Sequence, residues 1–143
     1  MAADPYQLQR FLEAQERDYP VALAELMQGQ KHSHWMWYIF PQVAGLGTSA
    51  MAQRYAIRSR EEAEAYLADG VLGSRVQACA AALLPHKGKA IREIMGFPDD
   101  LKLRSSLTLF ASLSPVGSVF HQALEAFFEG QQDARTIQFL KQA

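Results

Sequence analysis

The chain has 143 residues, 49% of them hydrophobic and 20% charged, and a formal net charge of -1. These values indicate one globular domain with a sizeable core over residues 1–143, and they exclude a disordered chain. The balanced charge gives no overall attraction to nucleic acid or to an anionic membrane, so neither is expected as a partner. The single cysteine, Cys79, excludes an internal disulfide and a cysteine-based zinc site within one chain.

The N-terminal sequence MAADPYQLQRF lacks the basic and apolar regions of a signal peptide. No run approaches the roughly 18–20 apolar residues that a membrane span requires. We therefore expect a cytoplasmic protein.

The first part of the chain predicts two helices separated by a proline. Asp4-Pro5 is typical of a helix start, with Asp as N-cap and Pro at the first helical position. Apolar residues then recur at helical spacing, and Tyr19-Pro20 is predicted to break the run. A second helix is expected after the break, ending near Gly29.

Residues 31–57, KHSHWMWYIFPQVAGLGTSAMAQRYAI, gather aromatic, basic and glycine residues without any Asp or Glu. From Trp35 to Phe40 both alternating faces are apolar, so periodicity does not separate a buried strand from a buried helical turn. Gly45 and Gly47 predict a turn whose backbone can approach a ligand closely. We interpret this stretch as the wall of a site.

Capping patterns predict the helices that follow. Thr48 or Ser49 is expected to cap a short helix through Tyr55, and Ser59 with Glu62 forms a capping box. Further helices are predicted from Leu72 to Leu83, from Ala90 to Met95, after Pro98, after Ser114-Pro115, and after Asp133. The fold class is therefore all-α, a compact single-domain multihelical bundle of about seven to eight helices.

The charge layout predicts an anion site. Carboxylates are absent from Leu26 to Arg60 and again from Leu101 to Leu124, whereas both stretches carry cations. If the stretches meet in space, their shared surface is electropositive and suits a phosphate or carboxylate held by Arg54 and Lys102. The alternative is chance clustering of acids, because residues 71–92 are also free of them.

Several side chains in these stretches have both a functional and a structural interpretation. Trp35 and Trp37 either stack on a flat ring of a ligand or belong to the core. His34 is either a general acid or base or a hydrogen-bonded structural residue. Asp100 is either a catalytic carboxylate or a first-turn acid that suits the helix dipole. No metal is expected, because His32 and His34 lack a third ligand nearby.

The stretch DDLKLRSSLTLFASL places small hydroxyl residues beside Lys102. Ser105, Ser106 and Thr108 occupy positions where a free surface usually carries Glu and Lys. We therefore expect this face to contact another element or a ligand, and we include Ser105 and Thr108 among the ligand-binding candidates.

Three blocks, SHWMWYIFPQ, GLGTSAMAQRYAI and DDLKLRSSLTLF, are similar in sequence and order to the signature blocks of the DUF1810 domain of unknown function. The resemblance covers the chain from about Tyr6 to Phe139 and implies an all-helical single-domain fold, but no reaction. Genomes sometimes label its members calpastatin, which implies inhibition of a calcium-dependent protease. Calpastatin inhibitory segments are disordered, whereas this chain is composed to bury a core.

The family's motif positions carry over to Lys31, Ser33, His34, Trp35, Trp37, Phe40, Pro41, Gln42, Gly45, Gly47, Ser49, Arg54, Tyr55, Asp100, Lys102, Ser105, Ser106 and Thr108. His32 stands where the family pattern has Arg or another basic residue. A fainter likeness to the NADAR helical proteins, which handle ADP-ribose-type ligands and N-glycosidic bonds, lies in a helical fold with an aromatic and basic pocket.

The leading hypothesis is a pocket for a small anionic molecule, either phosphorylated or nucleotide-like, without a cofactor. If the protein is an enzyme, hydrolysis of an N-glycosidic or phosphate-containing substrate fits best, with His34 or Asp100 as acid or base. The alternative is a non-enzymatic interaction module for an unknown partner protein, in which the same residues are structural.

Overall fold

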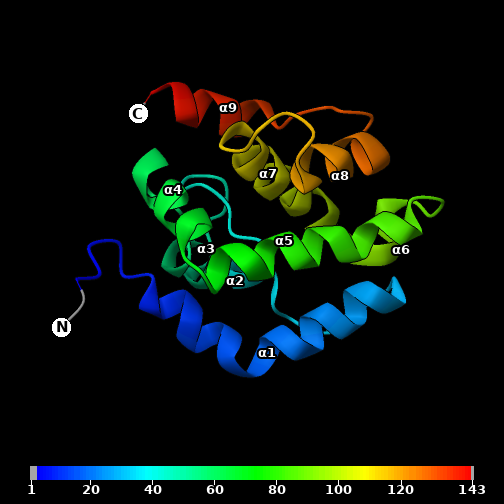
Figure 1. The fold of residues 1–143 in the computed structure, drawn as a ribbon, viewed down its shortest axis with the longest axis horizontal. Helices are drawn as coiled ribbons and strands as arrows, with labels where there is room; N and C mark the ends of the chain where they lie inside the picture. Colours follow the sequence, from blue (N-terminus) through cyan, green and yellow to red (C-terminus); the bar gives the residue numbers. More distant parts are fainter. Residues whose placement is uncertain (1–2, 143) are drawn as a thin grey trace.

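Helices make up the regular structure of residues 3–142, the part of the chain that the computed structural model describes (Figure 1). The elements are α1 (Gln9–Gln28), α2 (Met36–Ile39), α3 (Ala50–Arg54), α4 (Arg60–Ala68), α5 (Leu72–Leu83), the 3₁₀ turn η1 (Leu84–His86), α6 (Ile91–Met95), α7 (Asp99–Ser112), α8 (Val119–Phe128) and α9 (Ala134–Lys141). The predicted all-α class is confirmed. Trp35 to Phe40 folds as a helical turn, α2, and not as a strand.

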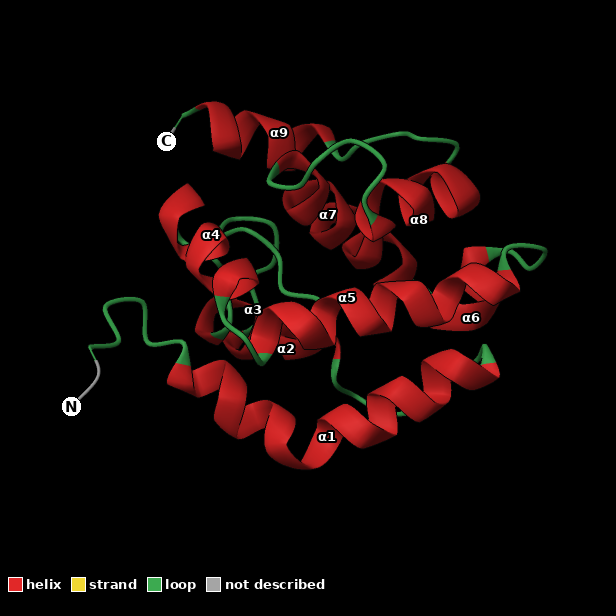
Figure 2. Ribbon diagram, viewed as in Figure 1, coloured by secondary structure: helices red, strands yellow, loops and turns green. Residues whose placement is uncertain are grey.

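Helix α1 continues through Pro20, so the predicted break at Tyr19-Pro20 is wrong. Phe11, Gln15, Ala22 and Leu26 are all buried, and their spacing places them on one face of a continuous helix on both sides of the proline. Burial along this face keeps the segments together despite the lost backbone hydrogen bond. Figure 2 shows the bend in the middle of α1, as expected for an internal proline.

Side-chain caps begin several of the helices. Ser49, Ser59 and Asp133 each accept a hydrogen bond from the backbone N–H three residues later, which confirms the predicted caps. Asp4 accepts from the backbone N–H groups four and five residues on, at 2.8 and 3.0 Å. The helix begins at Gln9 with Leu8 as its N-cap, so the predicted start at Asp4-Pro5 is wrong, and Asp4 instead holds the turn that leads into α1.

A row of aromatic rings passes through the core and joins helices that are distant in sequence. Phe11 of α1 contacts Tyr66 of α4, with ring centroids 5.0 Å apart. Tyr66 contacts Phe110 of α7 at 5.4 Å, and Phe110 contacts Phe120 of α8 at 5.5 Å. Figure 1 shows α5 lying between α1 and the pair α7 and α8, so this row runs across the layers.

The segment between α2 and α4 is fixed by a short parallel bridge between Val43 and Ile57. The N–H of Ala44 donates to the carbonyl of Ile57 at 2.8 Å, and the N–H of Ile57 donates to the carbonyl of Gln42 at 2.9 Å. These bonds position a loop, residues 42–49, beside α3.

Within residues 3–142 no single helix is long and apolar enough to cross a membrane. Helix α4 and the helical run Leu72–His86 meet the length and composition test only as a pair, and the pair is bent by 84°.

Candidate functional site

The two acid-free stretches, 26–60 and 101–124, meet where Lys102 lies over Trp37, which is the condition that the anion-site hypothesis required. The backbone N–H of Lys31 donates to the carbonyl of Ile94 at 2.7 Å, and Lys31 Nζ lies 2.9 Å from Asp99 at the start of α7. Lys102 Nζ lies 5.7 Å from the ring centroid of Trp37. Asp99 also lies 3.6 Å from Lys102. Both lysines therefore already have a carboxylate partner where the stretches converge.

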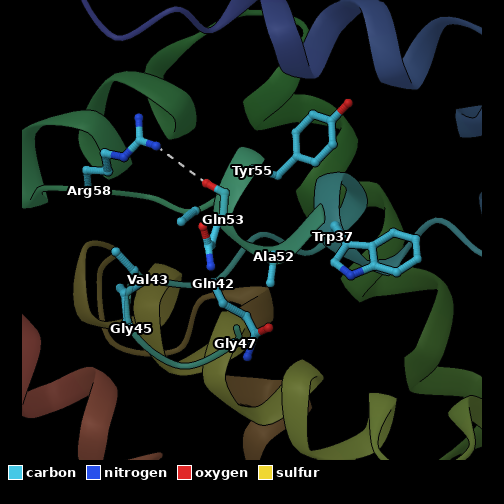
Figure 3. Close-up of a pocket in the computed structure, with 11 residues that line it drawn as sticks. Trp37, Gln42, Val43, Gly45, Gly47, Ala52, Gln53, Tyr55 and Arg58 are labelled. Carbon is cyan, nitrogen blue, oxygen red and sulfur yellow. Dashed lines mark hydrogen bonds between the residues drawn. The ribbon is translucent and has the colours of Figure 1, made fainter. Parts of the chain in front are cut away.

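A pocket of about 180 Å³ opens between the 42–49 loop and α3 (Figure 3). It is lined by Trp37, Gln42, Val43, Ala44, Gly45, Gly47, Ala52, Gln53, Tyr55, Ala56 and Arg58. Of the ligand-binding residues expected from the sequence, Trp37, Gly45 and Gly47 are brought together here. We name this cavity the glycine-loop pocket.

Arg58 is the charged residue that lines the glycine-loop pocket, and no carboxylate lines it. The Arg58 side chain is exposed, and its guanidinium reaches the carbonyl of Gln53 only at 3.5 Å. No ion pair involves Arg58 within residues 3–142. An unpaired guanidinium beside two amide side chains, from Gln42 and Gln53, makes an electropositive, hydrogen-bonding site. Sequence reasoning missed Arg58 in this role, although it follows the Val43–Ile57 bridge directly.

The two glycines fix the shape of the pocket. Gly45 adopts φ +94°, a conformation that favours glycine. At Gly47 a Cβ atom would lie 2.7 Å from the Cβ of Ala52, so the loop approaches α3 more closely than any larger residue allows. Arg135 of α9 donates to the carbonyl of Gly45 at 2.8 Å. Within the described part of the chain, neither glycine N–H donates a hydrogen bond to another backbone group.

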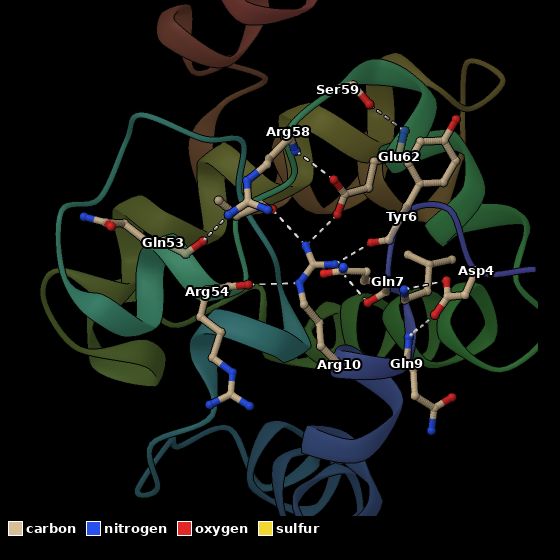
Figure 4. Close-up of polar contacts among 12 residues, drawn as sticks. Asp4, Tyr6, Gln7, Gln9, Arg10, Gln53, Arg54, Arg58, Ser59 and Glu62 are labelled. Atoms are coloured by element: carbon tan, nitrogen blue, oxygen red, sulfur yellow. Dashed lines mark hydrogen bonds and ion pairs between the residues drawn. The ribbon is translucent and has the colours of Figure 1, made fainter.

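Neither Arg54 nor Lys102, the two residues predicted to hold an anion, lines the glycine-loop pocket. The exposed guanidinium of Arg54 lies 5.5 Å from the ring centroid of Tyr55. Figure 4 shows the Arg54 side chain extending away from Arg58. The side chains of these two arginines, four residues apart, therefore point to different parts of the surface.

The carbonyl of Arg54, and not its side chain, belongs to a partly buried polar network (Figure 4). Arg10 of α1 donates to this carbonyl at 2.9 Å and to the carbonyl of Ala56 at 3.0 Å. Arg10 also pairs with Glu62 at 2.6 Å, and the two side chains are 12% and 5% exposed. Glu62 in turn accepts from the N–H of Arg58 at 3.0 Å. This network, which the sequence did not reveal, holds both ends of the segment that carries Tyr55.

Trp35 is a core residue and not a wall of the pocket. It is 1% exposed, and its indole Nε1 donates to Glu25 of α1 at 2.9 Å. Glu25 also accepts from the N–H groups of His32 and Ser33 and from the Ser33 hydroxyl. Burial by itself raises the pKa of this carboxyl, but the hydrogen bonds to it have the larger combined effect and lower the pKa from 4.5 to about 2. Glu25 immediately precedes the acid-free stretch, and it is the acceptor for the backbone of that stretch.

His34 and Asp100, the two catalytic candidates, lie outside the pocket and apart from its lining. The imidazole of His34 is exposed and forms no hydrogen bond within residues 3–142, whereas its carbonyl lies 3.3 Å from the hydroxyl of Tyr38. Asp100 is 5% exposed and lies 3.2 Å from Arg92. The structural interpretation of Asp100, a first-turn acid of α7, agrees with this placement.

The hydroxyl face of α7 contacts other elements, as its composition predicts. Ser105 is 6% exposed and donates to the carbonyl of Leu101 at 3.3 Å, and Ser106 is fully buried. Thr108, also fully buried, accepts from the N–H of Asp133 at 2.9 Å and so holds the start of α9. Neither Ser105 nor Thr108 lines the glycine-loop pocket, and Thr108 serves the packing of α9.

A family model described as "Protein of unknown function (DUF1810)" matches residues 5–140. The chain belongs to the DUF1810 family. A solved structure similar to this DUF1810 chain is that of the conserved hypothetical protein Rv1873 from Mycobacterium tuberculosis, with 45% sequence identity and a TM-score of 0.93. That match covers 96% of this chain and 99% of the other. A comparison with curated proteins gave no match.

The DUF1810 motif residues of this chain therefore divide into two groups. Trp37, Gln42, Gly45, Gly47 and Tyr55 line the pocket. The other group does not line it: Trp35, Asp100 and Thr108 are buried and form hydrogen bonds that hold helices together, whereas His34, Ser49 and Arg54 are exposed. We keep the first group, together with Arg58, as the candidate site.

Proposed function

We propose that the glycine-loop pocket binds a small phosphorylated or nucleotide-like molecule through its anionic group. The observation that carries the proposal is the charge of the lining, which includes Arg58 and no Asp or Glu. Arginine suits a phosphate because its planar guanidinium offers parallel N–H donors. Gly45 and Gly47 line the same pocket, and their N–H groups are proposed as further donors.

The volume of the pocket limits what enters it. Pockets that enclose a whole drug-sized ligand usually measure about 300–1,000 Å³, whereas this one measures about 180 Å³. The proposed occupant is therefore the phosphate or sugar-phosphate end of a ligand. A ring, where the ligand has one, rests at the rim against Trp37, which is half-buried.

The proposal is for binding, in a cytoplasmic protein, and includes no reaction. The acid and base candidates, His34 and Asp100, do not line the pocket. A proton transfer requires a group within hydrogen-bond reach of the reacting atom. Support for hydrolysis is therefore weaker than support for binding.

The test is isothermal titration of the full chain with inorganic phosphate, ribose 5-phosphate and ADP-ribose. The parent should bind at least one of them saturably, and Arg58→Gln should weaken that binding roughly 10- to 100-fold, since hydrogen bonds to charged groups contribute that much. Arg54→Gln is the matched control, because it removes the same charge four residues away and outside the pocket. Equal binding by parent and Arg58→Gln, or no binding of any of the three compounds, overturns the proposal.

A further inference from the structure

Two lysines share one carboxylate beside the glycine-loop pocket. Lys31 Nζ lies 2.9 Å from Asp99, and Lys102 Nζ lies 3.6 Å from the same side chain. Among the described residues, neither lysine forms an ion pair with any other acid. One carboxylate balances only one ammonium, so this group of three side chains keeps one positive charge that no ion pair neutralises.

Lys102 is the lysine whose charge is available to a ligand. Its ion pair with Asp99 is the longer of the two, and its side chain is 30% exposed. The side chain of Lys31 is only 7% exposed, and its Nζ also donates to the carbonyl of Ser33. An ammonium has three N–H donors, so one long ion pair leaves Lys102 with donors for a second acceptor.

Trp37 connects this free charge to the glycine-loop pocket. Its indole lines the pocket, and Lys102 Nζ lies 5.7 Å from the ring centroid, although Lys102 itself does not line the pocket. Figure 3 shows Trp37 and Arg58 on opposite sides of the other labelled pocket residues. Two cations that can accept an anion therefore lie beyond opposite ends of the same pocket.

The surface between these two cations suits a sugar or a similar ring more than a bare chain of phosphates. The pocket has no Asp or Glu in its lining, and Trp37 at its rim is half-buried and flat. An anion held by Arg58 and an anion held by Lys102 have the indole between them. The two groups must therefore be separated on the ligand, because adjacent phosphates of a diphosphate do not span an indole.

We infer that the ligand of the glycine-loop pocket is a sugar with two separate phosphate groups. Arg58 holds one phosphate, Lys102 holds the other, and the sugar rests against Trp37. The second phosphate site rests on the proposed function, because it requires the first phosphate to occupy the pocket. The competing role for Lys102 is purely structural, an ion pair within the first turn of α7 that has no influence on which ligand binds.

The test compares fructose 1,6-bisphosphate with fructose 6-phosphate, two probes that differ by one phosphate on the same sugar. Isothermal titration of the full chain at constant ionic strength should show that the parent binds the bisphosphate more tightly. In Lys102→Gln the ratio of the two affinities should fall roughly three- to tenfold, as expected for a charged hydrogen bond at a partly exposed side chain. Inorganic pyrophosphate, whose phosphates are adjacent, should bind without this dependence on Lys102.

Asp99→Asn should change the ratio in the opposite direction. This variant removes the carboxylate that competes with the ligand for Lys102, so the preference for the bisphosphate should increase. Damage to the fold does not produce a gain in affinity, so such a gain excludes a purely structural role for the ion pair. Lys87→Gln is the matched control, because it removes the charge of an exposed lysine outside the pocket and should leave the ratio unchanged.

The outcomes separate the second phosphate site from the proposed function. Suppose that fructose 6-phosphate binds and Arg58→Gln weakens it, but the ratio is the same in the parent, Lys102→Gln and Asp99→Asn. The second phosphate site is then overturned, and the proposed function stands. Lys102-dependent binding of pyrophosphate that is tighter than that of the bisphosphate also overturns it. Absence of binding of both fructose phosphates overturns it as well, whereas the proposed function is decided by its own three probes.

Discussion

The carboxylate of Glu25 lies 2.9 Å from the indole Nε1 of Trp35, and its four hydrogen bonds connect α1 to the turn that precedes α2. Glu25 is 8% exposed and Trp35 is 1% exposed. This contact determines where the aromatic segment begins, and therefore where Trp37 meets the glycine-loop pocket.

Glu25 should make the stability of the protein depend on pH in the acid range. Its pKa is about 2 in the folded chain, below the ordinary value of 4.5. A depressed carboxyl pKa stabilises the fold fully above pH 4.5, and this stabilisation is lost as the pH falls toward 2. We expect Glu25→Gln to lower the free energy of unfolding at pH 7 by about 2 to 3 kcal/mol. Urea unfolding at pH 7, 4.5 and 3 measures this, and equal losses in parent and variant would contradict it.

Gly47→Ala should destabilise the fold, because the new Cβ would lie 2.7 Å from the Cβ of Ala52. Overpacking of this kind costs about 1 to 3 kcal/mol. Gly88→Ala is the control, since nothing lies within 4 Å of a Cβ there. In a double-mutant cycle, Ala52→Gly should be less harmful in the Gly47→Ala background than in the parent. Thermal unfolding of the four chains measures the coupling, and strict additivity would refute the close approach.

Arg10→Met should be the more damaging of two arginine substitutions. It removes one partner of the largely buried pair with Glu62 and leaves the other uncompensated, which costs about 3 to 5 kcal/mol. Arg92→Met removes a guanidinium that is 64% exposed from a carboxylate that is 7% exposed, and because water reaches this pair from the arginine side it should cost less, about 1 kcal/mol. Urea midpoints of the two variants make the comparison. Similar losses would show that the buried guanidinium of Arg10 contributes no more than the exposed guanidinium of Arg92.

Thr108→Val should loosen the start of α9. Valine has nearly the same shape but no oxygen to accept from the N–H of Asp133, and an unpaired buried donor costs about 1 to 3 kcal/mol. Amide hydrogen exchange should speed up at Asp133. Ser112→Ala, which removes only a bond to a carbonyl of its own helix, is the control and should change stability little. Unchanged protection of the Asp133 amide in Thr108→Val would contradict the prediction.

Local chemistry explains why much of the fold is predictable from the sequence. The caps at Ser49, Ser59 and Asp133 act through bonds three residues away, so a short window contains both partners. Pro20 misled the prediction, because the burial that keeps α1 continuous comes from distant helices. Apolar residues on both sides of the proline, Phe11 and Leu26 among them, have the spacing of one continuous helix. This spacing indicated that α1 continues through Pro20.

The candidate site was less predictable, because it depends on which side of a short segment each side chain occupies. The charge layout required that the stretches containing Trp37 and Lys102 meet, and they do, but it could not itself show this. It did not distinguish Arg54 from Arg58, whose separation of four residues places them on one face only if the intervening chain is a continuous helix. Here α3 ends at Arg54 and the Val43–Ile57 bridge follows, so the chain direction changes between them.

The aromatic row from Phe11 to Phe120 has a consequence for how the protein folds during its synthesis. Its four rings come from four helices spread over most of the chain, so no contiguous half of the sequence contains the whole row. During synthesis the first helices therefore emerge without the rings that α7 and α8 later supply. Stable packing must wait until more than three quarters of the polypeptide is available.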